Sequence, residues 1–355
     1  MKKSQLLNRF LGITMASVLF LTACGGGDEA STDGGGEANG GGEGAATEES
    51  HTIKIAHYFA EDHPQNIALQ EVFKPTVEEN SGGSLTVEIY PNSQLGAEQE
   101  FYDGVRNGTI EMGIPGMIMQ SSVEKLAVGE WPFLFEDYEH VKNVLNGPIG
   151  DELMADLEEI HGVKPLAWSA NGFRMVSSDK LIDSMDDFSG FRMRTPNIPN
   201  YIEMWELLGT NVTPLAISEV FTGLEQGVIN GQENPVATVR ASGWYEVQSN
   251  VLESNHMFSP NLYIINSNFW NSLSPEQQQV IQDASLESAA YEFELMENSY
   301  EEDRAYLEEH GVEFTTPSDE FRQQMIDAVQ PMYDSFFEQY DWAEDIVERI
   351  QAEAQ

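Results

Sequence analysis

The feature that most constrains this chain is an uninterrupted helical stretch of thirty-five residues from Pro275 to Glu309. Ser274 precedes it as an N-cap, Gly311 follows it as a stop signal, and no Gly or further Pro lies inside it. At ~1.5 Å per residue this helix would be ~52 Å long, whereas a lobe of about 150 residues is only about 38 Å across. The helix must therefore contact two lobes.

The apolar spacing along this stretch predicts how it packs. A stripe with 3-4-3-4 spacing predicts a buried face along the first half of the helix, formed by Ile281, Ala284, Ser288, Tyr291 and Leu295. A free coiled coil is the alternative, but acidic residues interrupt any sustained heptad pattern.

From His51 onward, short apolar runs alternate with helical patterns, which predicts an α/β fold. The 305 residues from position 51 onward exceed what one core comfortably fills, so two lobes are expected. The predicted strands are Ile53–Tyr58, Leu85–Tyr90, Ile110–Ile114, Val163–Trp168, Phe173–Ser177, Phe191–Thr195 and Leu262–Ile265. The other predicted helices are Pro64–Glu79, Ala97–Arg106, His140–Leu145, Asp151–His161, Tyr201–Leu208 and Ser218–Gln226.

The N-terminus predicts export. Three bases in the first nine residues precede the uncharged apolar run Phe10–Leu21, which is too short to span a bilayer. We therefore expect a signal peptide at residues 1–23. Leu21–Cys24 (LTAC) resembles the bacterial lipobox, in which the cysteine is lipidated after cleavage. The alternative is an unprocessed, buried N-terminal helix with an incidental cysteine.

Residues 24–50 are expected to form a lipidated tether. Positions 25–50 contain ten Gly and seven Asp or Glu, and they lack Val, Ile, Leu, Met and aromatic residues, so they cannot form a core. A lipid-anchored chain of this kind would lie at the outer face of the cell membrane, in the extracytoplasmic space.

Composition excludes several classes of function. With 60 acidic against 17 basic residues the formal charge is −43, and no basic cluster could bind a nucleic acid. The single cysteine excludes an internal disulfide framework, and the seven scattered histidines show no metal-binding spacing. Because hydrolase and nucleotide-binding motifs are absent from the sequence, we expect no cofactor, no metal and no enzymatic activity; an exported hydrolase is the alternative.

Three arginines lie in apolar, strand-like contexts. Arg174 is part of ANGFRMV, and Arg192 and Arg194 are part of GFRMRTP. A partly buried arginine needs an anionic partner, and two converging guanidinium groups could hold a carboxylate with paired hydrogen bonds. On these features alone, a structural pair with Asp or Glu is the favoured interpretation.

The second arginine motif belongs to a longer resemblance. Gly190–Asn197 (GFRMRTPN), Leu208–Pro214 (LGTNVTP) and Ser218–Pro235 (SEVFTGLEQGVINGQENP) resemble the solute-binding proteins of tripartite ATP-independent periplasmic (TRAP) transporters. The similarity extends through Ser93–Gly96 (SQLG) and Asn171–Arg174 (NGFR), and it covers most of residues 53–300.

The resemblance implies a two-lobed periplasmic-binding-protein-like fold with a ligand cleft between the lobes and a long helix across both. Lobe I would comprise residues 51–172 plus about 260–299, and lobe II about 173–259 plus 300–355. The implied ligand is a small carboxylate such as a C4-dicarboxylate or a related acid. The implied partners are the small and large membrane subunits of a TRAP permease, and the protein would be a monomer. A ligand sensor for a signalling partner would share this fold and is the alternative.

The resemblance also implies roles for individual residues. Arg194 occupies the position of the main carboxylate-binding arginine, Arg174 that of a second one, and Asn234 that of an amide that completes the site. Arg192 would be a solvent-side or structural neighbour. The choice between Arg192 and Arg194 depends on the motif, because residues two apart share a strand face.

Three further positions follow from the same resemblance. His57 and Glu98 could contribute from the other lobe, although ordinary loop and helix-start roles fit them equally well. At Ile217 relatives often have an aromatic ring that stacks on the ligand. Its absence favours a smaller aliphatic acid over a flat or sugar-like one.

Overall fold

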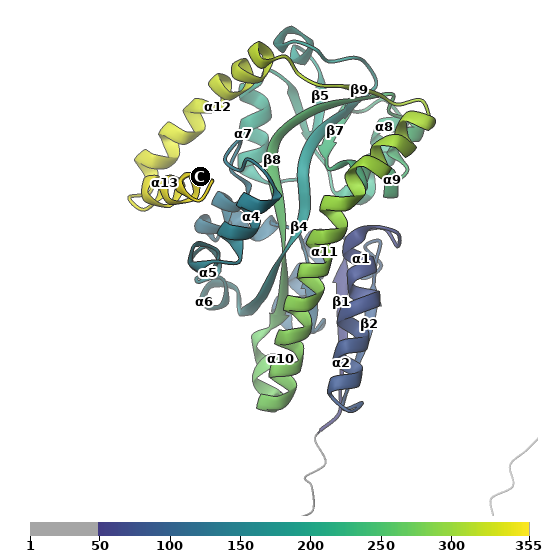
Figure 1. Ribbon diagram of the computed structural model, residues 1–355, viewed down its shortest axis with the longest axis vertical. Coiled ribbons are helices and arrows are strands. Elements are labelled where there is room, and N and C mark those ends of the chain that lie inside the picture. Colours follow the sequence, from purple (N-terminus) through teal and green to yellow (C-terminus); the bar gives the residue numbers. More distant parts are fainter. Residues whose placement is uncertain (1–48, 355) are drawn as a thin grey trace, which may run out of the picture. The chain divides into compact units, whose positions relative to one another are not determined.

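The computed structural model describes residues 49–354 (Figure 1). The predicted signal peptide, Cys24 and almost all of the predicted tether lie outside the described residues. The strands are β1 His51–His57, β2 Leu85–Tyr90, β3 Met112–Ile114, β4 Val163–Ser178, β5 Arg192–Thr195, β6 Asn211–Pro214, β7 Gly231–Asn234, β8 Asn250–Asn266 and β9 Glu313–Thr315. This mixed α/β architecture confirms the predicted fold class.

Helices connect and cover these strands. The α-helices are α1 Pro64–Ala68, α2 Lys74–Asn80, α3 Glu98–Asn107, α4 Tyr138–Leu145, α5 Pro148–Met154, α6 Leu157–His161, α7 Pro199–Leu207, α8 Val220–Glu225, α9 Val236–Ala241, α10 Ser267–Ser272, α11 Pro275–Glu309, α12 Asp319–Gln339 and α13 Ala343–Ala352. Residues Leu69–Phe73 form the π-helix η1. The 3-10 helices are η2 Ile118–Ser121, η3 Glu124–Glu130, η4 Met185–Phe188, η5 Ile217–Glu219 and η6 Trp244–Glu246. None of the described helices combines the length and the apolar character needed to cross a membrane.

One mixed sheet contains all the described strands, in the order β2-β1-β3-β8-β4-β7-β5-β6, with β9 also paired to β8. Strands β4 and β8 are 16 and 17 residues long and run antiparallel through its centre. Strand β3 pairs with the C-terminal end of β8, whereas β7 pairs with the C-terminal end of β4. The two long strands therefore connect two groups of shorter strands (Figure 1).

Strand β4 joins two segments that the sequence predicted as separate strands. Its pairing with β8 shifts register between Ala170 and Gly172, opposite Pro260 and Ser259. Gly172 has a φ of +114°, and a Cβ there would lie 2.9 Å from the Tyr138 hydroxyl. The glycine thus permits a local irregularity without ending the strand.

Helix α11 has the predicted bounds, and the Ser274 side chain caps it by accepting from the Gln277 amide at 3.2 Å. Its first half packs against α1, η1 and α2, and it also contacts α9 and β4. Ile281, Ala284 and Ser288 are buried as predicted, but the predicted stripe is wrong at Tyr291 and Leu295, which are only half-buried. A spacing of 3.5 residues drifts by ~20° per heptad on a straight helix, so the buried face moves on to Glu292, Phe293 and Met296.

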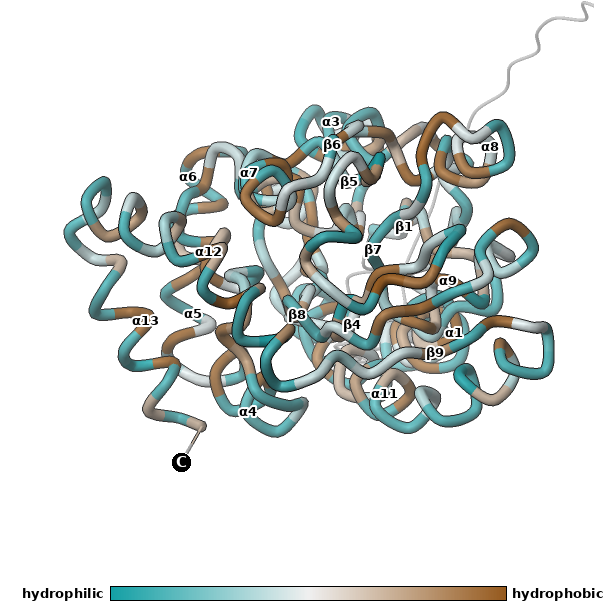
Figure 2. Tube along the Cα trace, turned by 90° about the horizontal axis from the view of Figure 1, so that it is seen from above, coloured by the Kyte–Doolittle hydropathy of each residue, from teal (hydrophilic) through white to brown (hydrophobic). Residues whose placement is uncertain are grey.

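The C-terminal helices α12 and α13 were not predicted from the sequence. Hydrophobic and hydrophilic stretches alternate along both, as expected for helices that bury one face (Figure 2). Helix α12 packs on α7, and α13 packs on α5. The His140 ring bonds the Ile350 carbonyl at 2.7 Å, which ties α4 to α13.

Candidate functional site

A small cavity lies where β4, β5 and β7 approach the segments that follow β1 and β3. Five of the six predicted site residues line it. The lining residues are Tyr58, Glu98, Pro115, Gly116, Met117, Ile118, Glu130, Arg174, Arg194, Pro196, Ile198, Tyr201, Ile217, Asn234 and Ser259.

Arg194 is the central cation of this cavity. Arg194 lies on strand β5, and only 1% of its surface is exposed. Its Nε and Nη2 atoms donate to the Leu215 carbonyl at 2.9 and 2.6 Å, and within residues 49–354 it forms no ion pair with an acidic side chain. Burial lowers the pKa of its guanidinium, and the charges of Glu98 and Glu233 oppose this effect. A carboxylate ligand would supply the missing counter-charge.

Arg192 lies two residues earlier on β5 and does not line the cavity. Its exposed side chain donates to the carbonyls of Val228 and Gly227 at 3.0 and 2.9 Å. Position along the strand thus separates the two arginines, a distinction that strand periodicity alone could not make.

Arg174 is also buried, but Glu233 already neutralises it. Its Nη2 donates to Oε1 of Glu233 at 2.8 Å, and its Nε donates to Oε2. Burial alone would lower the pKa of Arg174, but Glu233 raises it above its ordinary value. Burial would raise the pKa of the Glu233 carboxyl, but Arg174 and His256 lower it. For Arg174 the structural ion pair occurs, and the same side chain also lines the cavity.

The other predicted residues differ in their positions. Asn234, at the end of β7, is buried and donates to Oε1 of Gln232 at 2.6 Å. Ile217 and Glu98 line the cavity from η5 and the start of α3. Burial raises the pKa of Glu98, and Arg194 opposes this shift.

His57 does not line the cavity. It is fully buried, and its Nε2 lies 3.2 Å from Oδ1 of Asn66. The next residue, Tyr58, contributes to the wall instead. Successive side chains along a strand point to opposite faces of the sheet. Only one of the neighbours His57 and Tyr58 can therefore face the cavity.

Sequence reasoning missed a buried carboxyl group. Glu130, at the end of η3, accepts hydrogen bonds from the Tyr201 hydroxyl at 2.7 Å, from Ser259 and from Gln120. Burial raises its pKa, whereas Arg174 and the three donors lower it. The available signal was an acidic residue inside the apolar run AVGEWPF, where a charge needs several partners.

The space between these side chains is small. The cavity volume is about 30 Å³, which is room for about one or two water molecules. A second cavity of about 730 Å³ adjoins it and shares Glu98 and Ile118 with it. A multi-carbon acid therefore requires the walls to move apart. Among residues 49–354, no cluster of three or more His, Cys, Asp or Glu side chains could hold a metal ion.

Three features define a two-lobed solute-binding protein: a sheet with two long connecting strands, a long helix that contacts α1, α2, α9 and β4, and, in a cavity, a buried arginine without an ion-pair partner among the described residues. The chain belongs to the bacterial extracellular solute-binding protein family 7 of TRAP transporters, whose family model matches residues 55–340. The sequence resemblance to this family is thereby confirmed.

Two solved structures illustrate the relationship. A TRAP periplasmic solute-binding protein from Haemophilus influenzae, determined with bound L-gulonate, is 41% identical; the similarity covers 85% of this chain and 99% of that one, with a TM-score of 0.83. A Roseobacter denitrificans protein with bound L-galactonate is 33% identical over 82% of this chain and 100% of that one, with a TM-score of 0.76.

Among curated relatives, the 2,3-diketo-L-gulonate-binding periplasmic protein of Escherichia coli is 32% identical over 76% of this chain and 82% of its own length. Proteins of this family are extracytoplasmic, bind small organic acids and work with TRAP membrane permeases. The chain is therefore a capture protein for a small organic acid, in a family of solute-binding proteins rather than enzymes.

Proposed function

We propose that this protein captures a monocarboxylic sugar acid, of the aldonate type, and delivers it to its TRAP permease. The observation that most strongly supports this proposal is the arrangement of charges in the cavity. Arg174 and Arg194 are the buried arginines of the described chain, and only Arg194 lacks an ion-pair partner there. One uncompensated cation matches one carboxylate.

The remaining wall favours hydroxyl groups over a second carboxylate. Glu98 and Glu130 line the cavity together with the hydroxyls of Tyr58 and Tyr201 and the Asn234 amide. A second ligand carboxylate would face these acidic groups, and burying it beside them would cost additional free energy. Ligand hydroxyl groups can donate to the same oxygens. This argument outweighs the expectation that Ile217 favours a smaller aliphatic acid, and it disfavours a C4-dicarboxylate.

The solved relatives support this ligand class. L-Gulonate and L-galactonate, which are bound in two of them, each carry one carboxylate on a hydroxylated chain. A C4-dicarboxylate-binding protein of Rhodobacter capsulatus is 29% identical to this chain. In the proposed complex, Arg194, Arg174, Asn234, Glu98 and Ile217 contact the ligand.

His57 would not contact the ligand in this complex but would support the neighbouring Tyr58.

Capture would proceed by closure of the lobes, with no covalent step and no catalysis. The proposed lobes are residues 51–172 plus about 260–299, and about 173–259 plus 300–355. The register shift between Ala170 and Gly172, opposite Pro260 and Ser259, supports a hinge where the proposed lobes meet. Helix α12 contacts α7 of the second proposed lobe, and α13 contacts α5 of the first. The C-terminal segment therefore contacts both proposed lobes.

A binding panel tests the ligand class. The full chain is titrated in a calorimeter with L-gulonate, L-galactonate, succinate and L-malate at pH 7.5. We expect saturable binding of at least one aldonate and affinities at least tenfold weaker for both dicarboxylates. Preferential binding of succinate or malate would refute the proposed ligand class while leaving the transport family unaffected.

We also propose that Cys24 is lipidated and anchors a monomeric protein to the outer face of the cell membrane. The lipobox-like LTAC sequence after a short apolar run supports the anchor. Replacing Cys24 by Ser should release the protein from salt-washed membranes into the soluble fraction. A Cys24→Ser protein that stays in the membrane fraction would contradict the anchor, and light scattering on the released protein measures its oligomeric state.

A further inference from the structure

The acid cavity contains fewer cations than a bound carboxylate would need. Glu233 pairs with Arg174, and these two charges cancel. Among the described residues that line the cavity, Arg194 is then the remaining cation, and it shares the lining with two carboxyl groups, those of Glu98 and Glu130. An entering acid would add a third carboxylate. One guanidinium group cannot neutralise three buried carboxylates, so a further positive charge is needed, and a proton can supply it.

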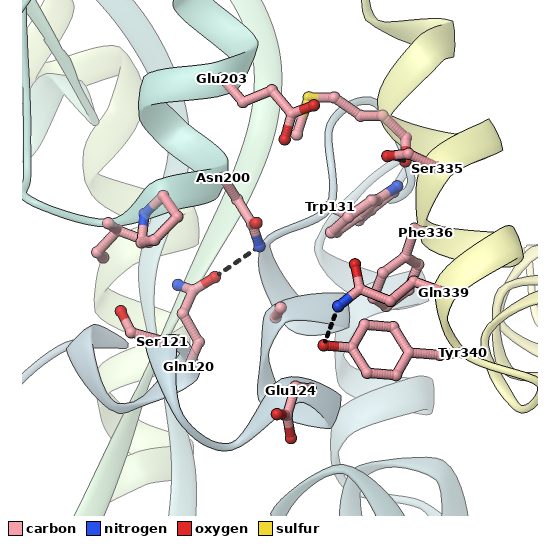
Figure 3. Close-up of a pocket in the computed structure, with 14 residues that line it drawn as sticks. Gln120, Ser121, Glu124, Trp131, Asn200, Glu203, Ser335, Phe336, Gln339 and Tyr340 are labelled. Atoms are coloured by element: carbon pink, nitrogen blue, oxygen red, sulfur yellow. Dashed lines mark hydrogen bonds between the residues drawn. The ribbon is translucent and has the colours of Figure 1, made fainter.

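Glu130 is the better supported of the two carboxyl groups. It accepts hydrogen bonds from the Tyr201 hydroxyl at 2.7 Å, from Ser259 and from Gln120. Gln120 is itself held in place, because the Asn200 amide donates to its Oε1 at 3.2 Å in the neighbouring pocket drawn in Figure 3. These donors favour the charged form of Glu130 without a contribution from the remaining cation.

Glu98 depends on Arg194 instead. Burial raises the pKa of the Glu98 carboxyl, and the charge of Arg194 is the largest effect that opposes this shift, ahead of the Ile217 backbone amide and Arg174. The other titratable groups that line this cavity are Tyr58, Glu130 and Tyr201. Both tyrosines are neutral, because burial raises the pKa of each hydroxyl. A ligand carboxylate at Arg194 and an ionised Glu98 therefore compete for one cation.

Glu98 also lines the second cavity of about 730 Å³, from which solvent can reach it. The further titratable groups in the lining of that cavity are Tyr102, Arg106, His161 and Glu219. None of these four replaces Arg194 as a counter-charge. Arg106 pairs with Asp103 at 3.3 Å, and burial lowers the pKa of the His161 ring, which is therefore neutral at pH 7 and above.

We propose that capture of the acid is linked to the uptake of one proton by Glu98, so that the acid anion and the proton bind together. The proton comes from a buffer acid through the solvent and forms an O–H bond on the Glu98 carboxyl, and the total charge of the cavity stays unchanged when the acid enters. Protonated Glu98 can donate a hydrogen bond to a ligand hydroxyl and still accept one. This inference rests on the proposed function, because the group that binds Arg194 must be a carboxylate.

Calorimetry of the full chain with L-gulonate and L-galactonate tests the linkage. Each titration is performed at pH 5.5, 6.5 and 7.5 in two buffers with different ionisation enthalpies, because the difference between the apparent binding enthalpies gives the number of protons taken up. We expect at least about 0.3 proton per acid at one or more of these pH values. Since a low pH favours uptake, the Kd should rise by about twofold to tenfold per pH unit in that range.

Binding of an aldonate with a smaller proton uptake at all three pH values overturns this inference and leaves the proposed function intact. If neither aldonate binds, the proposed function is wrong and the proton linkage is wrong with it. Infrared difference spectroscopy of the parent protein gives an independent measurement, because a protonated carboxyl should appear when the aldonate binds. A spectrum without such a carboxyl band also overturns the inference.

Glu98→Gln mimics the protonated carboxyl and should remove the linkage. Its proton uptake should fall below half of the parental value, and its Kd should vary by less than about twofold between pH 5.5 and 7.5. Glu100→Gln is the matched control, because Glu100 is exposed on the same helix and a glutamine oxygen can still accept from the Ala97 amide. It should keep the parental uptake. A Glu98→Gln protein that retains half or more of the uptake would show that another group takes the proton.

Discussion

Arg174 on β4 and Glu233 on β7 form a buried ion pair in which both carboxylate oxygens accept from the guanidinium. The Glu233 backbone carbonyl accepts a third hydrogen bond from Arg174 at 2.6 Å. His256 lies behind the pair, with its Nε2 3.3 Å from the same carboxylate. This neutralisation leaves Arg194 as the cation available to a ligand in the cavity.

Glu233→Gln should destabilise the protein strongly, because Arg174 would remain buried without its counter-charge. Losing one partner of a buried pair costs about 3–5 kcal/mol. The free energy of unfolding in urea measures this effect. The matched control is Glu302→Gln, which removes an exposed partner of Arg240 and should cost less than about 1 kcal/mol. A loss below 1 kcal/mol for Glu233→Gln would contradict the inferred role of the pair.

Arg194→Ala should remove the main anchor of the ligand carboxylate. Breaking a desolvated charge pair costs on the order of 2–5 kcal/mol, so the Kd should rise by roughly 30-fold to several-thousand-fold. Arg194→Lys should lie between Arg194→Ala and the parent, because an ammonium group keeps the charge but cannot present two parallel donors. Calorimetry with the aldonate found in the binding panel gives both values.

Arg192→Ala is the internal control for this series, since Arg192 is exposed on the same strand. It should bind the aldonate with nearly parental affinity. If Arg192→Ala abolished binding and Arg194→Ala did not, the assignment of the two arginines would be reversed. Circular dichroism of each variant shows whether a loss of binding reflects unfolding.

Elements with local sequence signals were predicted better than strands that depend on pairing with distant parts of the chain. The bounds of α11 followed from Ser274, Gly311 and the absence of internal breakers, all of which are local signals. Strands β6 and β7 were not predicted, because TNVTP and GQENP lack apolar runs and are held by neighbouring strands. Their formation depends on tertiary pairing, which single-sequence patterns do not contain.

The residues that line the cavity were predictable where a sequence motif contained them. Arg194, Arg174 and Asn234 came from the family resemblance, and they line one cavity. Glu130 and Tyr201 were missed because their roles arise from contacts with residues far away in sequence. The same limit applies to Glu233, whose partner Arg174 lies 59 positions earlier.

Acidification should destabilise the protein through His57. Burial lowers the pKa of this ring from 6.5 to about 4, although the bond to Asn66 opposes the shift. A depressed folded-state pKa contributes stability above the unfolded value and loses it as the pH falls, here between about 6.5 and 4. The loss for one such group is on the order of 3 kcal/mol.

His57→Gln should flatten this part of the pH profile, because the amide can still donate to Asn66 but does not titrate. Urea unfolding of parent and variant at pH 7.5, 6, 5 and 4 measures the slopes. The difference between the two free energies should shrink as the pH falls. Parallel profiles would show that His57 titrates normally in the folded protein.

Glu292 gives the opposite pH dependence. It is buried on α11, and its Oε2 accepts from the Ala170 amide of β4 at 2.6 Å, while Oε1 has no partner among the described residues. Burial raises the pKa of this carboxyl well above its ordinary value, and the Ala170 bond opposes the shift only in part. A raised folded-state pKa contributes stability that is full at low pH and is lost as the pH rises through the folded value.

Glu292→Gln should therefore stabilise the protein at alkaline pH. The amide oxygen can still accept from Ala170, and no charge forms in the interior as the pH rises. At pH 5 the variant and the parent should unfold at similar urea concentrations, whereas at pH 9 the variant should be more stable by at least 1 kcal/mol, a conservative bound for one buried charge. Glu294→Gln, on the exposed face of the same helix, should leave the parental profile in place. A Glu292→Gln protein that loses stability in parallel with the parent between pH 5 and 9 would show that Glu292 is already ionised in the folded state.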